Sequence, residues 1–212
     1  MKEPIVLAID TSCDETAAAV VQGRRILGNA IYSQILSHKQ WGGVVPSLAK
    51  RAHEERIDFI VDEALKRAKV TPAEIDAFAA TQGPGLAIAL EVGIKKAKEL
   101  AARYNKPLVA VNHMEGHIYS VFAQNRNGNP ERDFTFPYLA LLVSGGHTEF
   151  VTFTGHGQFE RIGHKVDDAA GEALDKAGRM LGLGYPAGAA IERLAKEVDN
   201  VDVYTFPRPM LS

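Results

Sequence analysis

Two histidines spaced four residues apart are the most chemically informative pair in this sequence. His113 and His117 follow the β-branched run 109–112 and open a stretch with helical periodicity. Side chains four residues apart lie on one face of an α-helix, so both imidazoles can reach a single metal ion. The spacing favours a metal site, and the alternative for the bare pair is two core or surface histidines.

The same pair argues against a zinc protease. In the His-Glu-x-x-His motif the glutamate directly follows the first histidine and acts as general base. Met114 occupies that position here, and Glu115 comes one residue later, on a different side of the helix. A metal site would also need a third ligand beside the two histidines, often a carboxylate.

A second reactive group lies in the loop 11–16, between an apolar strand predicted at 5–10 and a returning strand at 17–22. This loop carries two neighbouring carboxylates, Asp14 and Glu15, beside hydroxyl groups. The backbone N–H groups of such a turn can face a phosphate while a carboxylate holds a cation or a water. A solvated hairpin tip is the other interpretation of the loop.

Glycine-rich turns precede two of the predicted helices. Residues 82–86 separate a strand at 76–81 from a helix at 87–104, which is an arrangement that points helix N–H groups at an anion. The turn matches neither the Walker A nor the GxGxxG pattern, so a plain tight turn is an open alternative. Residues 182–188 similarly precede a helix at 189–198.

An acidic helix is predicted at 167–181. Its residues Asp168, Glu172 and Asp175 lie on neighbouring turns of one face. Carboxylates near a helix start are often explained by the helix dipole alone. The alternative is that one of them binds ribose hydroxyl groups.

The elements that must position these groups form two similar halves. Strand, small polar loop, strand, turn and strand occur once over 5–33 and again over 138–163. A helix with Ser47 as its N-cap is predicted to follow the first set and to reach Lys69. The repeat predicts a duplicated α/β unit with a cleft lined by both polar loops. We expect one subdomain at 1–130 and a second at 131–212.

Composition limits the classes of protein that remain. The 212 residues are 46% hydrophobic, carry a net charge of −2 and include one cysteine, Cys13. No apolar run approaches the roughly 20 residues that span a bilayer. The single cysteine excludes an internal disulfide and suits a reducing cytoplasm, so we expect a cytoplasmic protein without membrane association. The charge offers no large basic field for nucleic acid, which would need a local patch or a partner's charge.

Eight segments in chain order together resemble one family. They are residues 9–16 (Ile-Asp-Thr-Ser-Cys-Asp-Glu-Thr), 42–46 (Gly-Gly-Val-Val-Pro), 82–86 (Gln-Gly-Pro-Gly-Leu), 112–117 (Asn-His-Met-Glu-Gly-His), 142–149 (Leu-Val-Ser-Gly-Gly-His-Thr-Glu), 167–173 (Asp-Asp-Ala-Ala-Gly-Glu-Ala), 184–186 (Gly-Tyr-Pro) and 206–209 (Phe-Pro-Arg-Pro). The set closely resembles the TsaD (Gcp) family of tRNA threonylcarbamoyladenosine transferases, in its bacterial or organellar form.

The resemblance implies a fold and a reaction. The fold is the actin/Hsp70/sugar-kinase (ASKHA) type, a duplicated ribonuclease H-like fold, in agreement with the repeated halves. The reaction transfers a threonylcarbamoyl group from threonylcarbamoyl-adenylate to N6 of the adenosine 3′ to the anticodon, in tRNAs reading codons that begin with A, with release of AMP. The implied partners are tRNA and subunits similar to TsaB and TsaE.

The resemblance also implies site residues. It assigns a divalent metal to His113 and His117, with Fe²⁺ as the family's metal and Zn²⁺ as an alternative. It assigns an activity-related carboxylate to Asp14, and Glu15 is the neighbouring candidate to accept a proton. The adenylate-binding residues that it implies are Leu142, Val143, Ser144, Gly145, Gly146, Asp175 and Gly188.

Members of this family continue beyond the motif at 206–209. The resemblance therefore implies a C-terminally truncated chain with an incomplete second half, and a third metal ligand that is absent from it. Two further alternatives fit the same fold: a non-catalytic scaffold subunit of the modification complex, and a small-molecule kinase. Scaffold subunits of this kind lack the histidine pair, and the sequence shows no sugar-specific signature.

Overall fold

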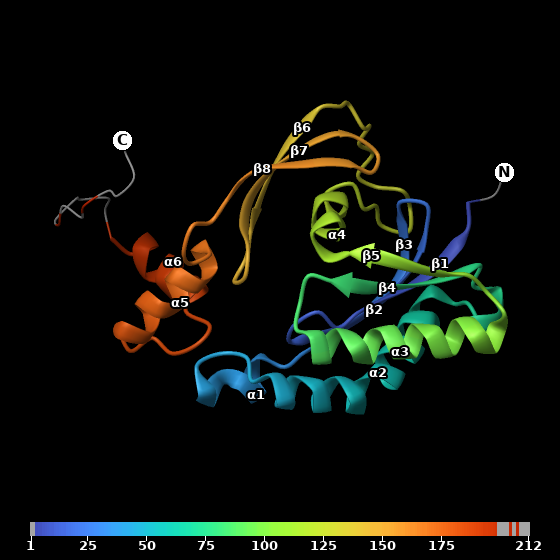
Figure 1. Cartoon of the computed structure of the whole chain (residues 1–212), viewed down its shortest axis with the longest axis horizontal. Helices are drawn as coiled ribbons and strands as arrows, with labels where there is room; N and C mark the ends of the chain where they lie inside the picture. Colours follow the sequence, from blue (N-terminus) through green and yellow to red (C-terminus); the bar gives the residue numbers. More distant parts are fainter. Residues whose placement is uncertain (1–2, 199–203, 205–206, 208–212) are drawn as a thin grey trace.

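Two β-sheets, one from each half of the chain, organise the structure (Figure 1). This computed structural model describes residues 3–198, 204 and 207, and its sheets, helices and side-chain contacts are those of these residues. Most of the motif at 206–209 therefore lies outside the described part. Within it, no helix is both long and apolar enough to cross a membrane.

The first sheet contains, in the described residues, five strands in the order β3-β2-β1-β4-β5. They are β1 (Ile5–Asp10), β2 (Glu15–Gln22), β3 (Arg25–Ser33), β4 (Ala77–Gly83) and β5 (Leu108–Asn112). Strands β1, β2 and β3 form an antiparallel meander, whereas β4 and β5 run parallel to β1. The carboxyl ends of β1, β4 and β5 consequently share one edge of the sheet, which is where α/β proteins place their ligands.

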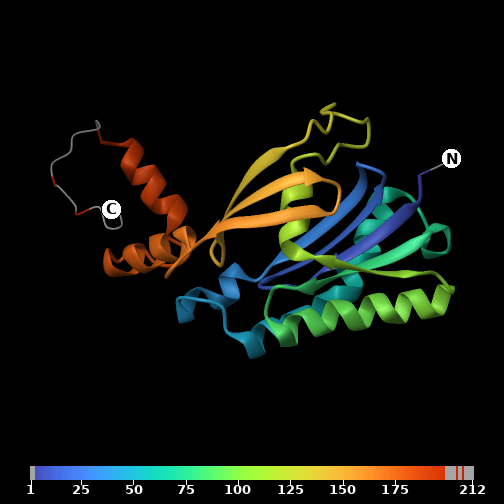
Figure 2. The ribbon, with the colours of Figure 1, turned by 45° about the horizontal axis from the view of Figure 1, so that its top comes forward.

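Helices cover this sheet on both sides (Figure 1, Figure 2). On one side, α2 (Pro46–Ala68) packs on β2 and β3, and α3 (Ala87–Tyr104) packs on β4. The short helices α1 (Ile35–His38) and η1 (Lys39–Trp41) lead into α2, and the 3₁₀ turn η2 (Pro72–Glu74) follows it. On the opposite side, α4 (His113–Ser120) contacts β4, β5 and the second sheet.

The main core lies between the first sheet and helices α2 and α3. Leu7, Val20 and Phe78 from the sheet are fully buried there against Ala64 and Ala97 from the helices. Burying these apolar side chains is the main favourable contribution to folding of this half. Gly28 permits the closest approach, because a Cβ built there would lie 2.4 Å from the backbone nitrogen of Ala68.

Ser47 does not cap helix α2, so that prediction was wrong. The N-cap is Val45, and Pro46 occupies the first helical position, where its missing N–H costs nothing. The helix ends at Lys69, which adopts the left-handed conformation. Pro46 therefore fixes where the segment 42–45 turns into the helix.

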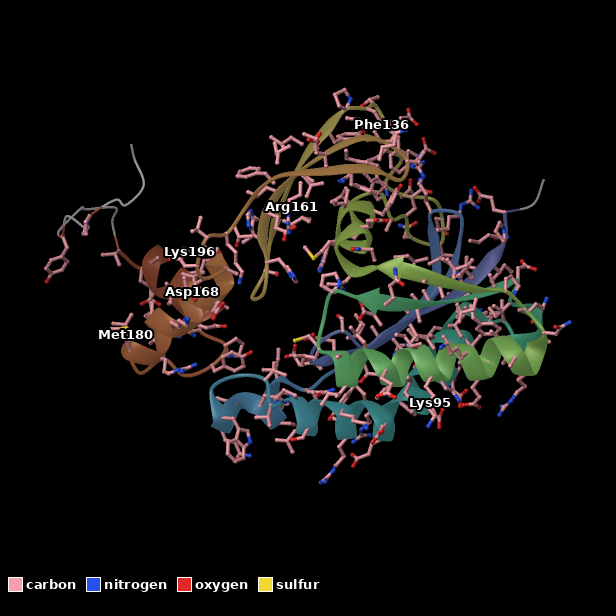
Figure 3. All side chains as sticks on the ribbon, viewed as in Figure 1. Lys95, Phe136, Arg161, Asp168, Met180 and Lys196 are labelled. Carbon is pink, nitrogen blue, oxygen red and sulfur yellow. The ribbon has the colours of Figure 1, made fainter. Side chains whose placement is uncertain are left out.

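The second half begins with a copy of the first meander. Strands β6 (Tyr138–Val143), β7 (Thr148–Gly155) and β8 (Gln158–His164) are antiparallel, in that order, within the described residues. Helices α5 (Ala170–Met180) and α6 (Gly188–Lys196) follow and pack on each other. An aromatic cluster joins this sheet to α4; it includes Phe122, Phe153 and Phe136, which is labelled in Figure 3.

The predicted repeat is thus confirmed as two β-meanders, each followed by helices. This is the duplicated α/β arrangement of the actin/Hsp70/sugar-kinase fold. The boundary at residue 130 stays a prediction, although it falls in the connection 121–137 between α4 and β6.

Candidate active-site cleft

A cavity of about 630 Å³ lies between the two halves. Its walls come from five places: the loop after β1, the segment 42–44, the turn after β4, the start of α4, and the second half from 144 to 185. Both polar loops of the repeat, 12–15 and 144–147, line it, as the sequence predicts. Cavities of this size are typical of small-ligand sites.

His113 and His117 lie on one face of α4 and both line the cavity. Their Nε2 atoms are 3.1 Å apart, and the rings meet edge to face. Two imidazole nitrogens bound to one metal at about 2.0–2.1 Å lie roughly 2.8–3.4 Å apart in octahedral or tetrahedral geometry. The pair therefore fits two neighbouring positions of a metal site.

Local sequence explains why α4 starts where it does. The side chain of Asn112 accepts hydrogen bonds from the backbone N–H groups of Met114 and Glu115, at 2.9 and 3.3 Å. This N-cap satisfies two of the N–H groups that a helix start leaves free. It fixes His113 in the first turn, at the carboxyl end of β5.

Asp10 orients the first histidine. Its Oδ2 lies 3.1 Å from Nδ1 of His113, and its Oδ1 accepts a hydrogen bond from the Ser12 backbone N–H at 2.7 Å. Burial by itself would raise the pKa of Asp10, but its hydrogen bonds with His113 and Ser12 outweigh it, and the pKa lies below its usual value. An ionised carboxylate on Nδ1 keeps the proton there and leaves Nε2 free as a ligand.

The second histidine is held in its neutral form. Burial, followed by the nearby His113, lowers the pKa of His117 below its usual value. Neutral imidazole is the form that binds metals. Within the described residues, no three His, Cys, Asp or Glu side chains converge on a point that could hold a metal ion by themselves.

Asp14 and Glu15 line the same cavity. Burial and the adjacent Asp14 raise the pKa of Glu15, whose Oε1 accepts a hydrogen bond from the Ser33 hydroxyl at 3.3 Å. Glu15 is the first residue of β2 and not part of the loop, because it pairs with Ser33 across the meander. Partial burial of the Cys13 thiol and the charge on Asp14 raise its pKa to about 12, so it stays protonated at neutral pH.

The loop 144–147 presents its backbone to the cavity. Ser144 Oγ accepts hydrogen bonds from the N–H groups of Gly146 and His147, at 3.3 and 3.0 Å. A Cβ built on Gly145 or Gly146 would meet nothing within 4 Å, so these glycines leave the loop open to a ligand. Gly171 has the opposite role, because its Cβ would lie 2.7 Å from the Ser144 carbonyl oxygen, and it lets α5 start close behind the loop.

Not every predicted adenylate-binding residue reaches the cavity. Asp175 lines it, and its Oδ1 accepts a hydrogen bond from the Ala187 backbone N–H at 2.7 Å. Leu142, Val143 and Gly188 are not among the residues that line it. Leu142 packs on the aromatic cluster and Val143 faces outward.

Two cationic side chains of α5 also line the cavity, and sequence reasoning missed both. Lys176 forms ion pairs with Asp168 at 2.6 Å and with Glu172 at 3.2 Å (Figure 3 labels Asp168). Arg179 reaches across to the first half and donates a hydrogen bond to the Gly42 carbonyl at 2.7 Å. Asp10 was missed as well, although its position at the end of a strand parallel to β5 was a usable signal.

The fold and the cleft define a class: a protein of the actin/Hsp70/sugar-kinase type with a histidine pair in the wall of its interdomain cleft. The TsaD family, described as tRNA N6-adenosine threonylcarbamoyltransferase, matches residues 25–212. The chain belongs to this family.

Relatives bear the same description. A Listeria monocytogenes tRNA N6-adenosine threonylcarbamoyltransferase is 51% identical over 211 residues, which cover 99% of this chain and 59% of the relative. The Anaeromyxobacter protein of that name is 54% identical over 207 residues, 97% of this chain and 60% of its own. The chain thus spans about three-fifths of the length of these relatives. Among solved structures, YeaZ from Pseudomonas aeruginosa aligns with 76% of this chain and 65% of its own, at 21% identity and a TM-score of 0.49.

Proposed function

We propose that this chain belongs to a tRNA threonylcarbamoyladenosine transferase and that its first half supplies the catalytic side of the active-site cleft. The reaction transfers threonylcarbamoyl from threonylcarbamoyl-adenylate to N6 of the adenosine 3′ to the anticodon, in tRNAs that read codons beginning with A. The single observation that carries the proposal is the convergence of the histidine pair, the Asp14–Glu15 carboxylates and the open loop 144–146 on one cavity.

The histidine pair supplies two ligands for a divalent metal. His113 and His117 would hold it through their Nε2 atoms, which lie 3.1 Å apart, with Asp10 fixing the first ring. The two histidines would thereby provide Lewis-acid chemistry for polarising the carbamoyl carbonyl. We assign Fe²⁺ on the family's pattern and keep Zn²⁺ as the alternative, since imidazole suits both.

The loop 144–146 would cradle the adenylate. Its glycines leave the backbone open to the cavity, and the Gly145 N–H would bind a phosphate oxygen, since the N–H of Gly146 already donates to Ser144 Oγ. Asp175 lines the same cavity. Its Oδ1 accepts the Ala187 N–H, and its Oδ2 would accept a hydrogen bond from a ribose hydroxyl. Leu142, Val143 and Gly188 would then act by shaping the loop and the turn rather than by touching the ligand.

The carboxylates of Asp14 and Glu15 would move the proton. When the N6 amine attacks the carbamoyl carbon, a C–N bond forms, the C–O bond to the adenylate phosphate breaks, and AMP leaves with that electron pair. The amine must then lose a proton. Glu15 is suited to accept it because its raised pKa makes it a stronger base than an ordinary glutamate, and Asp14 stands beside it.

We place the reaction in the cytoplasm, where tRNA is the substrate and where subunits similar to TsaB and TsaE are the expected partners. Membrane association is not part of the proposal.

A transfer assay tests the proposal. Threonylcarbamoyl-adenylate and unmodified tRNA are supplied to this chain and to a form extended with the C-terminal part of the Listeria relative, each with the partner proteins. We expect threonylcarbamoyl incorporation into tRNA with the extended form, and less with the shorter one. Lack of transfer by the extended form would overturn the proposal.

Metal analysis of His113→Ala and His117→Ala tests the ligands separately. Each substitution removes one of two ligands, so bound Fe²⁺ or Zn²⁺ should fall sharply in both variants. Unchanged metal content in either variant would remove that histidine from the site.

A further inference from the structure

Four buried polar side chains lie directly behind the carboxylate wall of the cavity. Thr16, Gln34, His38 and His53 come from β2, the end of β3, α1 and α2, and each is at most 1% exposed. We refer to them as the buried histidine network. The proposed reaction uses none of them.

The ring of His53 has one defined proton position. Its Nε2 lies 3.0 Å from the Cys13 carbonyl oxygen, which can only accept, so Nε2 carries the proton. Its Nδ1 lies 2.8 Å from the Thr16 hydroxyl and accepts from it. Burial lowers the pKa of His53, in agreement with a neutral ring. His53 therefore ties the Cys13 carbonyl to helix α2.

The ring of His38 has the same form. The Val45 backbone N–H donates to Nδ1 at 3.3 Å, so the ring proton is on Nε2, which lies 3.1 Å from Gln34 Oε1. His38 therefore ties the end of the segment 42–45 to Gln34.

Gln34 lies between the two histidines. Its backbone N–H donates to the Asp14 carbonyl at 2.9 Å, and its side-chain Nε2 donates to the Ala49 carbonyl of α2 at 3.4 Å. The same amide group packs against the ring of His53, with Nε2 3.3 Å from both ring nitrogens. Through Gln34, the network holds the carbonyl groups of Cys13 and Asp14 and the N–H of Val45 in one assembly. Residues 12–15 and 42–44 are adjoining parts of the cavity wall.

We propose that His38 and His53 are positioning residues that hold the loop 12–15 and the segment 42–45 as one rigid wall, so that Asp14 and Glu15 face the cavity. Burying four polar side chains costs free energy that apolar side chains of similar volume would not cost. The network in return fixes the orientation of the wall, because its hydrogen bonds to Cys13, Asp14 and Val45 hold backbone groups of the wall. The effect of the network on catalysis rests on the proposed function, whereas the hydrogen-bond geometry of the network does not.

The first test measures proton positions in the unmodified chain. Long-range ¹H–¹⁵N NMR on the histidine rings at neutral pH should show both His38 and His53 as neutral rings protonated on Nε2. A ring protonated on Nδ1, or a charged ring, at either position would overturn the proposal. This test needs no variant and no activity.

The second test uses matched variants of His38. His38→Leu removes the acceptor for the Val45 N–H, and His38→Asn keeps an oxygen near the position of Nδ1. Hydrogen exchange at Val45 and in the segment 42–45 should rise about tenfold in the leucine variant and less in the asparagine variant, since one hydrogen bond is lost in the first.

Leu65→Ala serves as the control for lost stability. Leu65 is buried near the C-terminal end of α2, whereas the segment 42–45 precedes its N-terminal end, so Leu65→Ala should lower the melting temperature without selectively opening that segment. Equal exchange of this segment in the leucine and control variants would show a merely structural role and overturn the proposal. If His38→Leu does not fold, the asparagine variant against the control decides.

The third test measures catalysis. In the extended form, His38→Leu and His53→Leu should lower kcat about tenfold or more with little change in KM for the adenylate, because they misplace the carboxylates and not the loop 144–146. Asparagine at 38 should restore part of the loss. If the unsubstituted extended form shows no transfer, the proposed function fails, and the NMR and exchange results still decide the positioning role.

Discussion

Replacing Asp10 with asparagine separates the orientation of His113 from the metal ligands themselves. The substitution keeps size and shape but removes the negative charge. In the structure, Oδ2 of Asp10 faces Nδ1 of His113 at 3.1 Å, while Oδ1 accepts the Ser12 N–H at 2.7 Å. The Asp10 side chain is the hydrogen-bond acceptor in both contacts.

An asparagine side chain can satisfy only one of these contacts. If its oxygen takes the Ser12 N–H, its NH₂ group faces Nδ1 and drives the His113 proton to Nε2, which is the atom that binds metal. If its oxygen faces Nδ1, its NH₂ group meets the Ser12 N–H and two donors oppose each other. Loss of such an outer partner lowers metal affinity about 10–100-fold, or roughly 1.4–2.7 kcal/mol.

Calorimetric titration with Zn²⁺ measures this change directly. We expect Asp10→Asn to weaken binding in that range, while the exposed Asp133→Asn, which lies away from the cavity, leaves affinity unchanged. Melting curves without metal should show that the Asp10 variant remains folded. Equal Zn²⁺ affinity in the Asp10 variant and the unsubstituted chain would refute the role of Asp10 as the group that orients His113.

Two stability predictions follow from the same structure. A Cβ on Gly178 would lie 2.0 Å from the Cβ of Ala187, so Gly178→Ala should destabilise the α5–α6 pair by about 1–3 kcal/mol in urea unfolding. Gly116→Ala is the control: a Cβ on Gly116 would meet nothing within 4 Å, so this variant should be neutral or stabilising. Equal effects of the two substitutions would contradict the packing argument. Because the folded pKa of Glu15 is raised above its usual value of 4.5, the folded state binds the extra proton between these two values, and its contribution to stability falls as pH rises through that window. The stability of Glu15→Gln relative to the unsubstituted chain should therefore increase as pH rises from acidic to neutral. A stability difference that does not change with pH would count against the raised pKa of Glu15.

The elements whose signal is local are those that the sequence predicts best. The strand at 5–10 and the helix at 87–104 agree with the structure at both ends. An apolar run or a 3.6-residue period, closed by a turn, contains the needed information. Boundaries moved where a partner strand decides them, as at Glu15, which pairs with Ser33 and so begins β2.

The site residues likewise divide into those that local sequence predicts and those that only the tertiary structure reveals. The pairing of His113 with His117 follows from helical spacing alone and could be predicted. The hydrogen bond of Asp10 to His113 depends on the strand order, and that of Arg179 to Gly42 depends on how the two halves meet. The spacing of His38 and His53 in the sequence gives no sign of the buried histidine network, because the network runs through Gln34 and two backbone segments.

The close packing at Gly28 has a long-range consequence. A side chain there would press on the backbone of Ala64 and Ala68, at the end of α2 farthest from the cavity. The helix has 23 residues and is about 34 Å long, and its other end starts at Pro46, directly after the segment that forms part of the cavity wall. Because a helix behaves as a stiff rod, a push at one end tilts the other. Mutational scans should therefore find position 28 intolerant of every side chain, with loss of ligand binding preceding loss of folding, although Gly28 does not line the cavity.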